Sequence, residues 1–368
     1  MPAMSRAVLA AAAVATTVAI PAAALGSVYV PPSSGTASGT GWSVAWTTVD
    51  TATCSIGSGT QTGGQCAPGT LGSPQVAASA FGAVWLVGGG AEGTLTNTSV
   101  LQVVNPTTSA VASPITISGI TQPEAAVQGG SYLWIAGQTE GSANGTSATR
   151  VVGVDSTGTV RKTFQSSLKT NAAGGQSIAY GAGKVWVGDS ANRIYALSPS
   201  TGKLLRTIKT SNTRNLAVGG GKLWGTDSRG HTVKVFNTSN GTLEATRSVA
   251  GSPNAVLASG SSVYVFSQSY LYAYSTKTLK QTGRWAAPIS GSGWVGAAVG
   301  PGGLWASNFV AQIVRFNTAT KKFDVNAQWS NNDTAGPLAS AGGALWVPDT
   351  SASPFPSGHG VTRFTVTS

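Results

Sequence analysis

Residues 184 to 218 read KVWVGDSANRIYALSPSTGKLLRTIKTSNTRNLAV and contain the two features that decide the fold. The first is an aliphatic residue before an aromatic one, with a Gly-rich step in front, here at Trp186. The second is an apolar residue followed by a small polar turn-former, here Leu197-Ser198. Helical periodicity is absent, so the pattern indicates short strands joined by tight turns.

Both features recur along the chain. The first occurs as AVWLV (Trp85), YLWIA (Trp134), KVWVG (Trp186), KLWGT (Trp224), SVYVF (Tyr264), GLWAS (Trp305) and ALWVP (Trp346). These anchors are 49, 52, 38, 40, 41 and 41 residues apart, which is the period of one four-stranded propeller blade. The second feature follows each anchor as Val104-Asn105, Val154-Asp155, Leu197-Ser198, Phe236-Asn237, Tyr274-Ser275, Phe316-Asn317 and Phe364-Thr365. The repeats predict an all-β fold, a seven-bladed β-propeller of four-stranded antiparallel blades.

The fourth repeat resolves into four strands, which we name A to D in chain order. They are predicted at Asn215–Val218, Lys222–Gly225, Thr232–Phe236 and Thr242–Val249. The last repeat lacks strand D because the chain stops soon after strand C at Thr362–Val366. Residues 42–49 alternate like a strand and belong to no repeat, so we expect this N-terminal strand to close the last blade. The recurrent Trp residues are expected to pack between neighbouring blades.

The repeat pattern G-x-(L/V)-W-V-x-D-S-x-x-N-x-(I/V)-x-x-(L/F)-(S/N)-x-x-(T/N)-G-x-L resembles the YVTN and quinoprotein-like family of β-propellers, and Lys184 to Val218 matches it best. The resemblance covers residues from about 75 to 368. It implies a fold and leaves the chemistry open, because members include binding proteins, surface proteins and a few enzymes. It also implies that the D–A and B–C connections emerge together on one face, around the mouth of a central channel.

Residues 1–24 are predicted to form a signal peptide, with Arg6, an apolar stretch from Ala7 to Ile20 and small residues at Ala22–Ala24. A retained N-terminal anchor is the alternative. The mature chain is therefore expected to be secreted, at the cell surface or periplasmic, without a further membrane span, and monomeric.

The predicted organisation is a flexible linker at 25–40 followed by one propeller domain at 41–368. Within this domain we expect a closing strand at 42–49, a disulfide loop at 51–74 and seven blades. The blades are predicted at about 75–120, 121–172, 173–211, 212–250, 251–289, 290–330 and 331–368.

The two cysteines, Cys54 and Cys66, are expected to form a disulfide bond. They lie in a stretch rich in Gly, Thr and Ser, and a bond there would contribute ~2–3 kcal/mol by closing a short loop. A metal site or a redox pair is the alternative, but the CxxC spacing and partner ligands for either are missing.

Charge is unevenly distributed along the chain. There are 22 basic and 11 acidic residues, yet no Lys or Arg occurs between residues 7 and 149. Four acidic residues fall in that stretch: Asp50, Glu92, Glu124 and Glu140. One sector of the ring is therefore predicted to be acidic and the rest basic.

The lengths of the B–C connections single out the same sector. From anchor to strand C the spacing is 19, 20 and 18 residues in blades 1, 2 and 7, against 11, 12, 10 and 11 in blades 3 to 6. The three long blades are neighbours once the ring closes, and the Cys54/Cys66 stretch joins them. Long loops on a rigid scaffold commonly carry binding sites. Acidic and aromatic residues here predict binding of a carbohydrate or a cationic group; they are Glu92, Glu124, Glu140, Asp349, Phe355 and His359. A bound cation such as calcium is an alternative, although no D-x-D-x-D-G loop is present, so neither a metal nor a cofactor is predicted.

A second candidate site comes from the residue ten before each anchor. These residues would ring the channel mouth, and they are Gln75, Glu124, Gln176, Arg214 and Asn254, with Trp294 beside the corresponding place in blade 6. A polar ring also suits an ordinary water-filled channel, so both interpretations stay open. Three residues after the anchors, Asp189, Asp227 and Asp349, with Asn308 in blade 6, are expected to cap turns.

Most basic residues follow the C–D turns, as Arg161, Lys162, Lys203, Arg206, Lys209, Lys277, Lys280, Arg284, Lys321 and Lys322. Strand D is outermost, so this charge is predicted on the outer wall, either simply solvated or in contact with a polyanion. Nucleic acid is not expected as a partner, because basic and aromatic residues do not interleave.

Within the resembled family, the enzymatic alternative is a streptogramin-lyase-like activity, which relies on His and Glu residues on the top face. The two histidines, His231 and His359, belong to blades three apart, too distant to act on one substrate atom. The Trp-Phe-Thr-Glu motif of the lyase repeats is also missing. The favoured prediction is an exported, non-catalytic binding scaffold, with no catalytic residues assigned.

Overall fold

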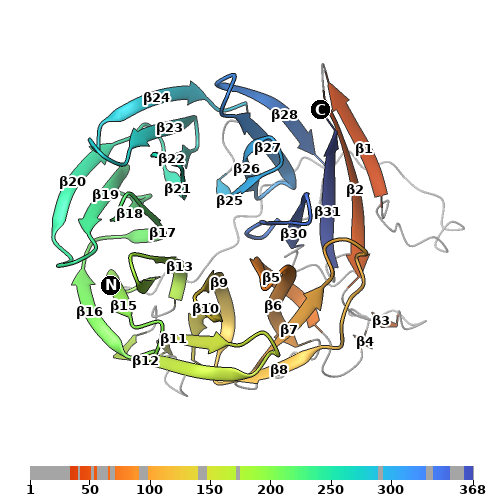
Figure 1. Ribbon diagram of the computed structural model, residues 1–368, viewed down its shortest axis with the longest axis horizontal. Coiled ribbons are helices and arrows are strands. Elements are labelled where there is room, and N and C mark those ends of the chain that lie inside the picture. Colours follow the sequence, from red (N-terminus) through yellow and green to blue (C-terminus); the bar gives the residue numbers. More distant parts are fainter. Residues whose placement is uncertain are drawn as a thin grey trace, which may run out of the picture.

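The computed structural model describes residues 34–39, 42–50, 54–55, 65–66, 71–90, 98–139, 147–170, 175–288, 293–328, 335–348 and 360–367. Seven antiparallel sheets stand side by side in a closed ring, as Figure 1 shows. The predicted fold class is confirmed: the chain is an all-β, seven-bladed β-propeller. No helix that could cross a membrane occurs among the residues described.

Blades 1 to 3 each follow the inner-to-outer order A-B-C-D, and neighbouring strands are antiparallel. Blade 1 contains β5 (Leu71–Ala80), β6 (Ala83–Gly90), β7 (Thr98–Val104) and β8 (Ile115–Ser118). Blade 2 contains β9 (Thr121–Gly129), β10 (Tyr132–Gln138), β11 (Ser147–Val154) and β12 (Val160–Thr170). Blade 3 contains β13 (Gly175–Gly181), β14 (Lys184–Asp189), β15 (Arg193–Leu197) and β16 (Leu204–Lys209).

Blades 4 to 6 repeat this order. Blade 4 contains β17 (Thr213–Gly219), β18 (Lys222–Asp227), β19 (Thr232–Asn237) and β20 (Leu243–Ser248). Blade 5 contains β21 (Pro253–Ser259), β22 (Ser262–Ser267), β23 (Tyr270–Ser275) and β24 (Gln281–Ala286). Blade 6 contains β25 (Trp294–Gly300), β26 (Gly303–Asn308), β27 (Gln312–Asn317) and β28 (Lys322–Gln328).

Blade 7 joins the two ends of the chain. Its inner strands are β29 (Ala339–Ala341), β30 (Ala344–Pro348) and β31 (Gly360–Thr367), and its fourth strand is β2 (Trp42–Asp50). β2 pairs with β31 from Ser43↔Thr367 to Asp50↔Gly360, which confirms the predicted closure. β1 (Ser34–Gly39) adds a fifth strand outside β2. Residues 34–39 are therefore strand, where the sequence predicted a flexible linker.

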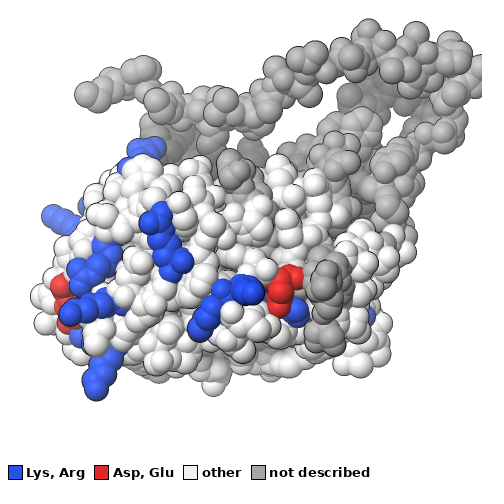
Figure 2. Space-filling model, turned by 90° about the horizontal axis from the view of Figure 1, so that it is seen from above, with Lys and Arg blue, Asp and Glu red and all other residues white. Residues whose placement is uncertain are grey.

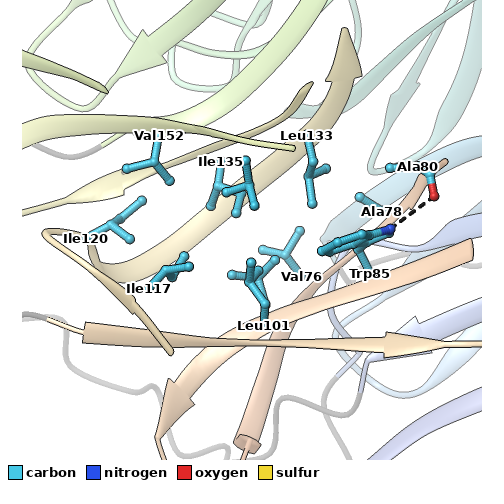
Figure 3. Close-up of a cluster of buried hydrophobic side chains, with 12 residues drawn as sticks. Val76, Ala78, Ala80, Trp85, Leu101, Ile117, Ile120, Leu133, Ile135 and Val152 are labelled. Carbon is cyan, nitrogen blue, oxygen red and sulfur yellow. Dashed lines mark hydrogen bonds between the residues drawn. The ribbon is translucent and has the colours of Figure 1, made fainter. Parts of the chain in front are cut away.

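The anchor tryptophans hold the blades together in two ways. Each is fully or almost fully buried between blades, as Figure 3 shows for Trp85 among the side chains of blades 1 and 2. Each indole N–H also donates to a carbonyl in or beside the A–B turn of its own blade; in Figure 3 this is Trp85 Nε1 to Ala80 O, at 3.0 Å. The other five bonds have the same form: Trp134 to Gly129, Trp186 to Gly181, Trp224 to Gly219, Trp305 to Pro301 and Trp346 to Ala341. A phenylalanine could fill the same space but could not make this bond.

The second repeated feature caps the C–D turns. Asn237 Oδ1 accepts the backbone N–H groups of Ser239 and Asn240, and Asn317 Oδ1 accepts those of Ala319 and Thr320. Asn105 does the same in blade 1. A short polar side chain that bonds to the backbone two or three residues later stabilises a tight turn.

Antiparallel order also divides the ring into two faces. The A–B and C–D turns lie at one end, which we call the lower face, and the B–C and D–A connections lie at the other, the upper face. The A–B turn of blade 4 shows how tight the lower turns are. Gly220 and Gly221 have φ of 60° and 70°, and a Cβ on Gly220 would lie 2.5 Å from Thr276 in blade 5. Only glycine meets both conditions at Gly220.

Candidate functional site

Six inner strands carry a β-bulge near the upper end, where their register with strand B shifts. A bulge inserts an extra residue into one strand and redirects its side chain. The residues at these shifts are Gln75, Glu124 (with Gln122 and Pro123), Gln176, Arg214, Asn254 and Val295. The repeat therefore places one irregular residue per blade around the upper end of the channel.

Five of these residues are the predicted rim residues, but Trp294 is not a sixth. Trp294 is 2% exposed, packs against Phe266 at 5.4 Å between ring centroids, and donates its indole N–H to Ser267 O at 2.6 Å. It belongs to the core between blades 5 and 6, and Val295 takes the bulge position. Trp294, which was expected to line the channel mouth beside the position ten residues before Trp305, is buried in the core, while Val295, which has that spacing, lies at the bulge.

The bulge residues form a mainly amide rim. Gln75, Glu124, Gln176 and Asn254 are half-buried. The Gln176 Oε1 atom is buried and accepts no hydrogen bond within the described part of the chain. The rim is tied to its neighbours through the backbone as well, since Asn215 Nδ2 donates to Asn254 O at 2.5 Å. Amide groups both donate and accept, so such a rim can bind hydroxyl or amide groups of a ligand.

Charge is scarce along this inner surface. In the seven inner strands as described, the charged residues are Glu124 and Arg214, in blades 2 and 4. The remainder of these strands is small, apolar or amide-bearing. Inner strands with so few charged residues suit a neutral or weakly charged ligand.

Just behind the rim, the acidic side chains of strand B serve the B–C turns. Asp189 Oδ1 accepts the N–H groups of Ala191 and Arg193, and its Oδ2 accepts the Tyr195 hydroxyl at 3.0 Å. In blade 6, Asn308 Oδ1 caps the equivalent turn through the N–H groups of Val310 and Gln312. The predicted turn-capping role is confirmed at these two positions.

Asp227 caps its turn through the Gly230 N–H at 2.7 Å and also forms an ion pair with Lys234 at 2.8 Å. Burial raises the pKa of the Asp189 carboxyl, and its hydrogen bonds only partly oppose this. At Asp227 burial acts in the same direction, but Lys234 and the Gly230 N–H outweigh it, so the pKa is lowered. Both carboxylates therefore stabilise the turns of their own blades.

His231 also has a structural place. It lies in the B–C turn of blade 4 with φ of 51°, and its carbonyl accepts the Val249 N–H at 2.9 Å. The imidazole is exposed. His359, the other histidine, lies outside the described residues.

Phe309 and Val310 form an exposed apolar feature of the upper face that sequence reasoning missed. They occupy the B–C turn of blade 6, and Phe309 is 54% exposed. Between this ring and Asn254 lies Gly293: a Cβ there would be 3.1 Å from both Asn254 Nδ2 and Phe309 Cε2. An exposed aromatic ring therefore lies close to an amide of the channel rim. The sequence signal was available, since the turns of blades 3 to 5 have small or polar residues where blade 6 has Phe-Val.

The remaining predicted site residues, Glu92, Glu140, Asp349, Phe355 and His359, lie outside the described residues. The two cysteines are described by backbone alone: β3 (Cys54–Ser55) and β4 (Gln65–Cys66) form a small antiparallel ladder in which Cys54 faces Cys66. Directly opposed residues in such a ladder have Cα atoms about 4.5–5.5 Å apart, within the range that a disulfide requires. The disulfide stays a prediction. In the described part of the chain no three His, Cys, Asp or Glu residues cluster as metal ligands would.

Several predicted outer-wall cations lie on or beside the outer strands. Lys203, Arg206 and Lys209 are exposed on and just before β16. Arg284 on β24 lies over the Tyr270 ring at 3.7 Å, so part of this charge also packs against aromatic rings. Figure 2, which looks at the outer wall on the side of β24 and β28, shows separate groups of Lys and Arg with few acidic residues among them.

No family model matches the chain, and no curated protein matches it. Among solved structures, the chain is similar to BamB from Moraxella catarrhalis, with 12% sequence identity, a TM-score of 0.48 and coverage of 77% of this chain and 79% of that one. No residue role is transferred from this likeness. Membership of the YVTN family stays a prediction.

Proposed function

We propose that the protein is an exported, non-catalytic binding scaffold whose ligand meets the upper face at blades 7, 1 and 2. The supporting observation is that these three blades are consecutive and have the longest B–C connections. Side chains of β30 and β31 pack with those of β6 in one core cluster, so blade 7 lies next to blade 1 in the ring. Strands B and C are separated by residues 91–97 in blade 1, 139–146 in blade 2 and 349–359 in blade 7. In blades 3 to 6 the corresponding connections are only 190–192, 228–231, 268–269 and 309–311.

The ligand class follows from the residues around the whole channel mouth and in these three connections. The rim residues Gln75, Gln176 and Asn254 offer amide groups, and Phe309 offers an exposed ring. The three connections add Glu92, Glu140 and Phe355, and residues 7–149 contain no Lys or Arg. Aromatic rings with amides and carboxylates suit a sugar or a cationic group better than a polyanion.

The test is to shorten residues 91–97, 140–146 and 349–359 to the turn lengths of blades 3 to 5. The full chain and the shortened chain are compared on an array of immobilised glycans and quaternary-ammonium conjugates. We expect the full chain to bind members of this array and the shortened chain to lose that binding while keeping its melting temperature within a few degrees. Binding that survives shortening but is lost in Lys203→Ser/Arg206→Ser/Lys209→Ser would place recognition on the outer wall and contradict the proposal.

A further inference from the structure

The lower face, opposite to the proposed ligand site, has an unusual charge balance. Among the described residues it carries acidic side chains at or near the C–D turns, and each forms an ion pair with a base of its own blade. These pairs are Asp155–Arg161, Glu244–Lys222 and Asp324–Arg315, all at 2.7 Å. The acidic groups of this face are therefore already neutralised within single blades.

Five other lysines of the same face have no such partner. Lys203, Lys277, Lys280, Lys321 and Lys322 lie at or beside the C–D turns of blades 3, 5 and 6 and are exposed. Within the described residues none of them forms an ion pair. Uncompensated cations grouped on one face raise the local potential and attract an anionic surface.

Two further lysines add to this charge on the same face. Lys162 and Lys184 lie over the rings of Tyr132 and Trp186, with Nζ at 5.5 and 5.9 Å from the ring centroids. Neither has a carboxylate partner in the described residues. The cationic face thus extends over blades 2, 3, 5 and 6.

Exposed apolar side chains lie among these cations. Leu204, Leu205 and Leu243, at the lower ends of β16 and β20, are 47%, 53% and 54% exposed. Tyr180 and Val299, near the lower ends of inner strands, are also exposed. Five of the seven large exposed apolar residues of the described chain therefore lie on the lower face.

Among the outer strands of blades 2 to 6, only that of blade 3 has a leucine, Leu205, at its bulge. Each outer strand of blades 2 to 6 has a bulge at its second or third residue. In blades 2, 4 and 6 that residue is Arg161, Glu244 or Asp324, each held in an ion pair of its own blade. In blade 3 it is a leucine beside a second exposed leucine and Lys203.

We propose that the lower face docks peripherally on a lipid bilayer that contains anionic headgroups. The lysine ammonium groups lie against the headgroup phosphates, and the exposed leucines enter the interfacial region. The cations are spread over the turns of several blades, and apolar residues lie between them, so a broad amphipathic surface fits better than a single linear polyanion. This docking is independent of the proposed ligand site, which it would leave facing away from the bilayer.

The test is sedimentation of the full chain with vesicles of phosphatidylcholine alone or with phosphatidylglycerol added, at low and physiological salt. We expect binding only to the phosphatidylglycerol vesicles, weakened by salt. Lys280→Ser/Lys322→Ser should reduce the affinity about thirtyfold, because each lysine near the surface contributes about one kilocalorie per mole of attraction. The matched control Lys209→Ser/Arg229→Ser removes the same charge at the upper end of the ring and should change the affinity less than threefold.

A second variant separates the apolar contribution. Leu204→Ser/Leu205→Ser keeps every charge and should weaken vesicle binding most clearly at physiological salt, where the electrostatic attraction is screened. Equal losses in the two charge variants would show that only net charge acts and would overturn the proposal. So would binding to soluble polyphosphate without any binding to vesicles.

Discussion

Blades 3 to 6 and blades 7, 1 and 2 are built on one repeat but differ at the upper face. In blades 3 to 6, strands B and C are joined by turns such as Gln268–Ser269, and acidic residues such as Asp189 cap those turns or pair with a base. In blades 7, 1 and 2 the connections are longer, and blade 1 contains no Lys or Arg. The buried tryptophan and its bond to the A–B turn occur in both regions, in every blade except blade 5, whose anchor is Tyr264. Folding therefore depends on the shared repeat, and the variable connections are free to serve recognition.

The largest expected effect concerns the strand that joins the two regions. Val44 on β2 is fully buried between blades 6 and 7, whereas Thr47 on the same strand is exposed and faces Arg363. Val44→Asp places an unpaired charge in the core and should lower the free energy of unfolding by more than about 4 kcal/mol, or prevent folding. Thr47→Asp should have little effect. Chemical denaturation followed by tryptophan fluorescence measures both; similar stabilities would mean that β2 does not close the ring.

A smaller effect should follow from removing one indole N–H in the scaffold region. Trp224→Phe removes the bond to Gly219 O, at 3.3 Å, and part of the buried ring, so we expect a loss of about 1–3 kcal/mol in the free energy of unfolding. Blade 5 provides the control, because its anchor is Tyr264, and Tyr264→Phe should change stability far less. If both variants lose the same stability, the bond to the A–B turn contributes nothing and packing alone explains the repeat.

The scaffold region should also be sensitive to alkali. Burial raises the pKa of Tyr195 and of Tyr274 to about 12, helped by Asp189 and Tyr272 respectively. Because these folded-state values exceed the unfolded value of about 10, the stabilisation is complete below pH 10 and is lost as the pH rises toward 12. Melting temperatures measured from pH 8 to 11.5 should fall above pH 10.

Tyr274→Phe is the matched variant for this pH effect. The Tyr274 hydroxyl is buried without a hydrogen-bond partner in the described residues, so its removal should cost little at neutral pH. The variant should lose less stability than the wild type between pH 10 and 11.5. An unchanged alkaline slope would show that Tyr274 ionises normally in the folded protein.

The smallest stability effect is expected at the upper face itself. Phe309 is exposed, so Phe309→Ser should leave the free energy of unfolding within about 0.5 kcal/mol of the wild type. Its effect should appear instead in binding to the glycan or quaternary-ammonium array, as a weaker signal than the wild type gives. A large loss of stability would mean that Phe309 packs against the upper face and is not available to a ligand.

The sequence predicted what the repeat encodes locally and missed what depends on pairing between strands. The spacing of Trp85 to Trp346 and the alternation of residues 42–49 were enough for seven blades and their closure. The burial of Trp294, by contrast, depends on its packing against Phe266 and its hydrogen bond to Ser267 O in blade 5. β1 was also missed: Ser34–Gly39 has no apolar alternation, and it is held by the free edge of β2.

In the candidate site, too, the sequence located some residues and missed others. Gln75, Gln176 and Asn254 could be placed at the channel mouth because they keep a fixed distance from the anchors. The sequence places Phe309 in the B–C turn of blade 6, but the exposure of its ring next to Asn254 depends on how that turn packs near Gly293. Periodicity therefore locates a face of the ring, and packing decides which side chains remain open on it.

Hydrogen–deuterium exchange of the full chain, with and without the ligand that binds best on the array, tests the central claim most directly. We expect slower exchange in peptides that cover residues 91–97, 140–146 and 349–359, and unchanged exchange across β16, β20 and β24. Slower exchange confined to those outer strands, with the three connections unaffected, would contradict the claim.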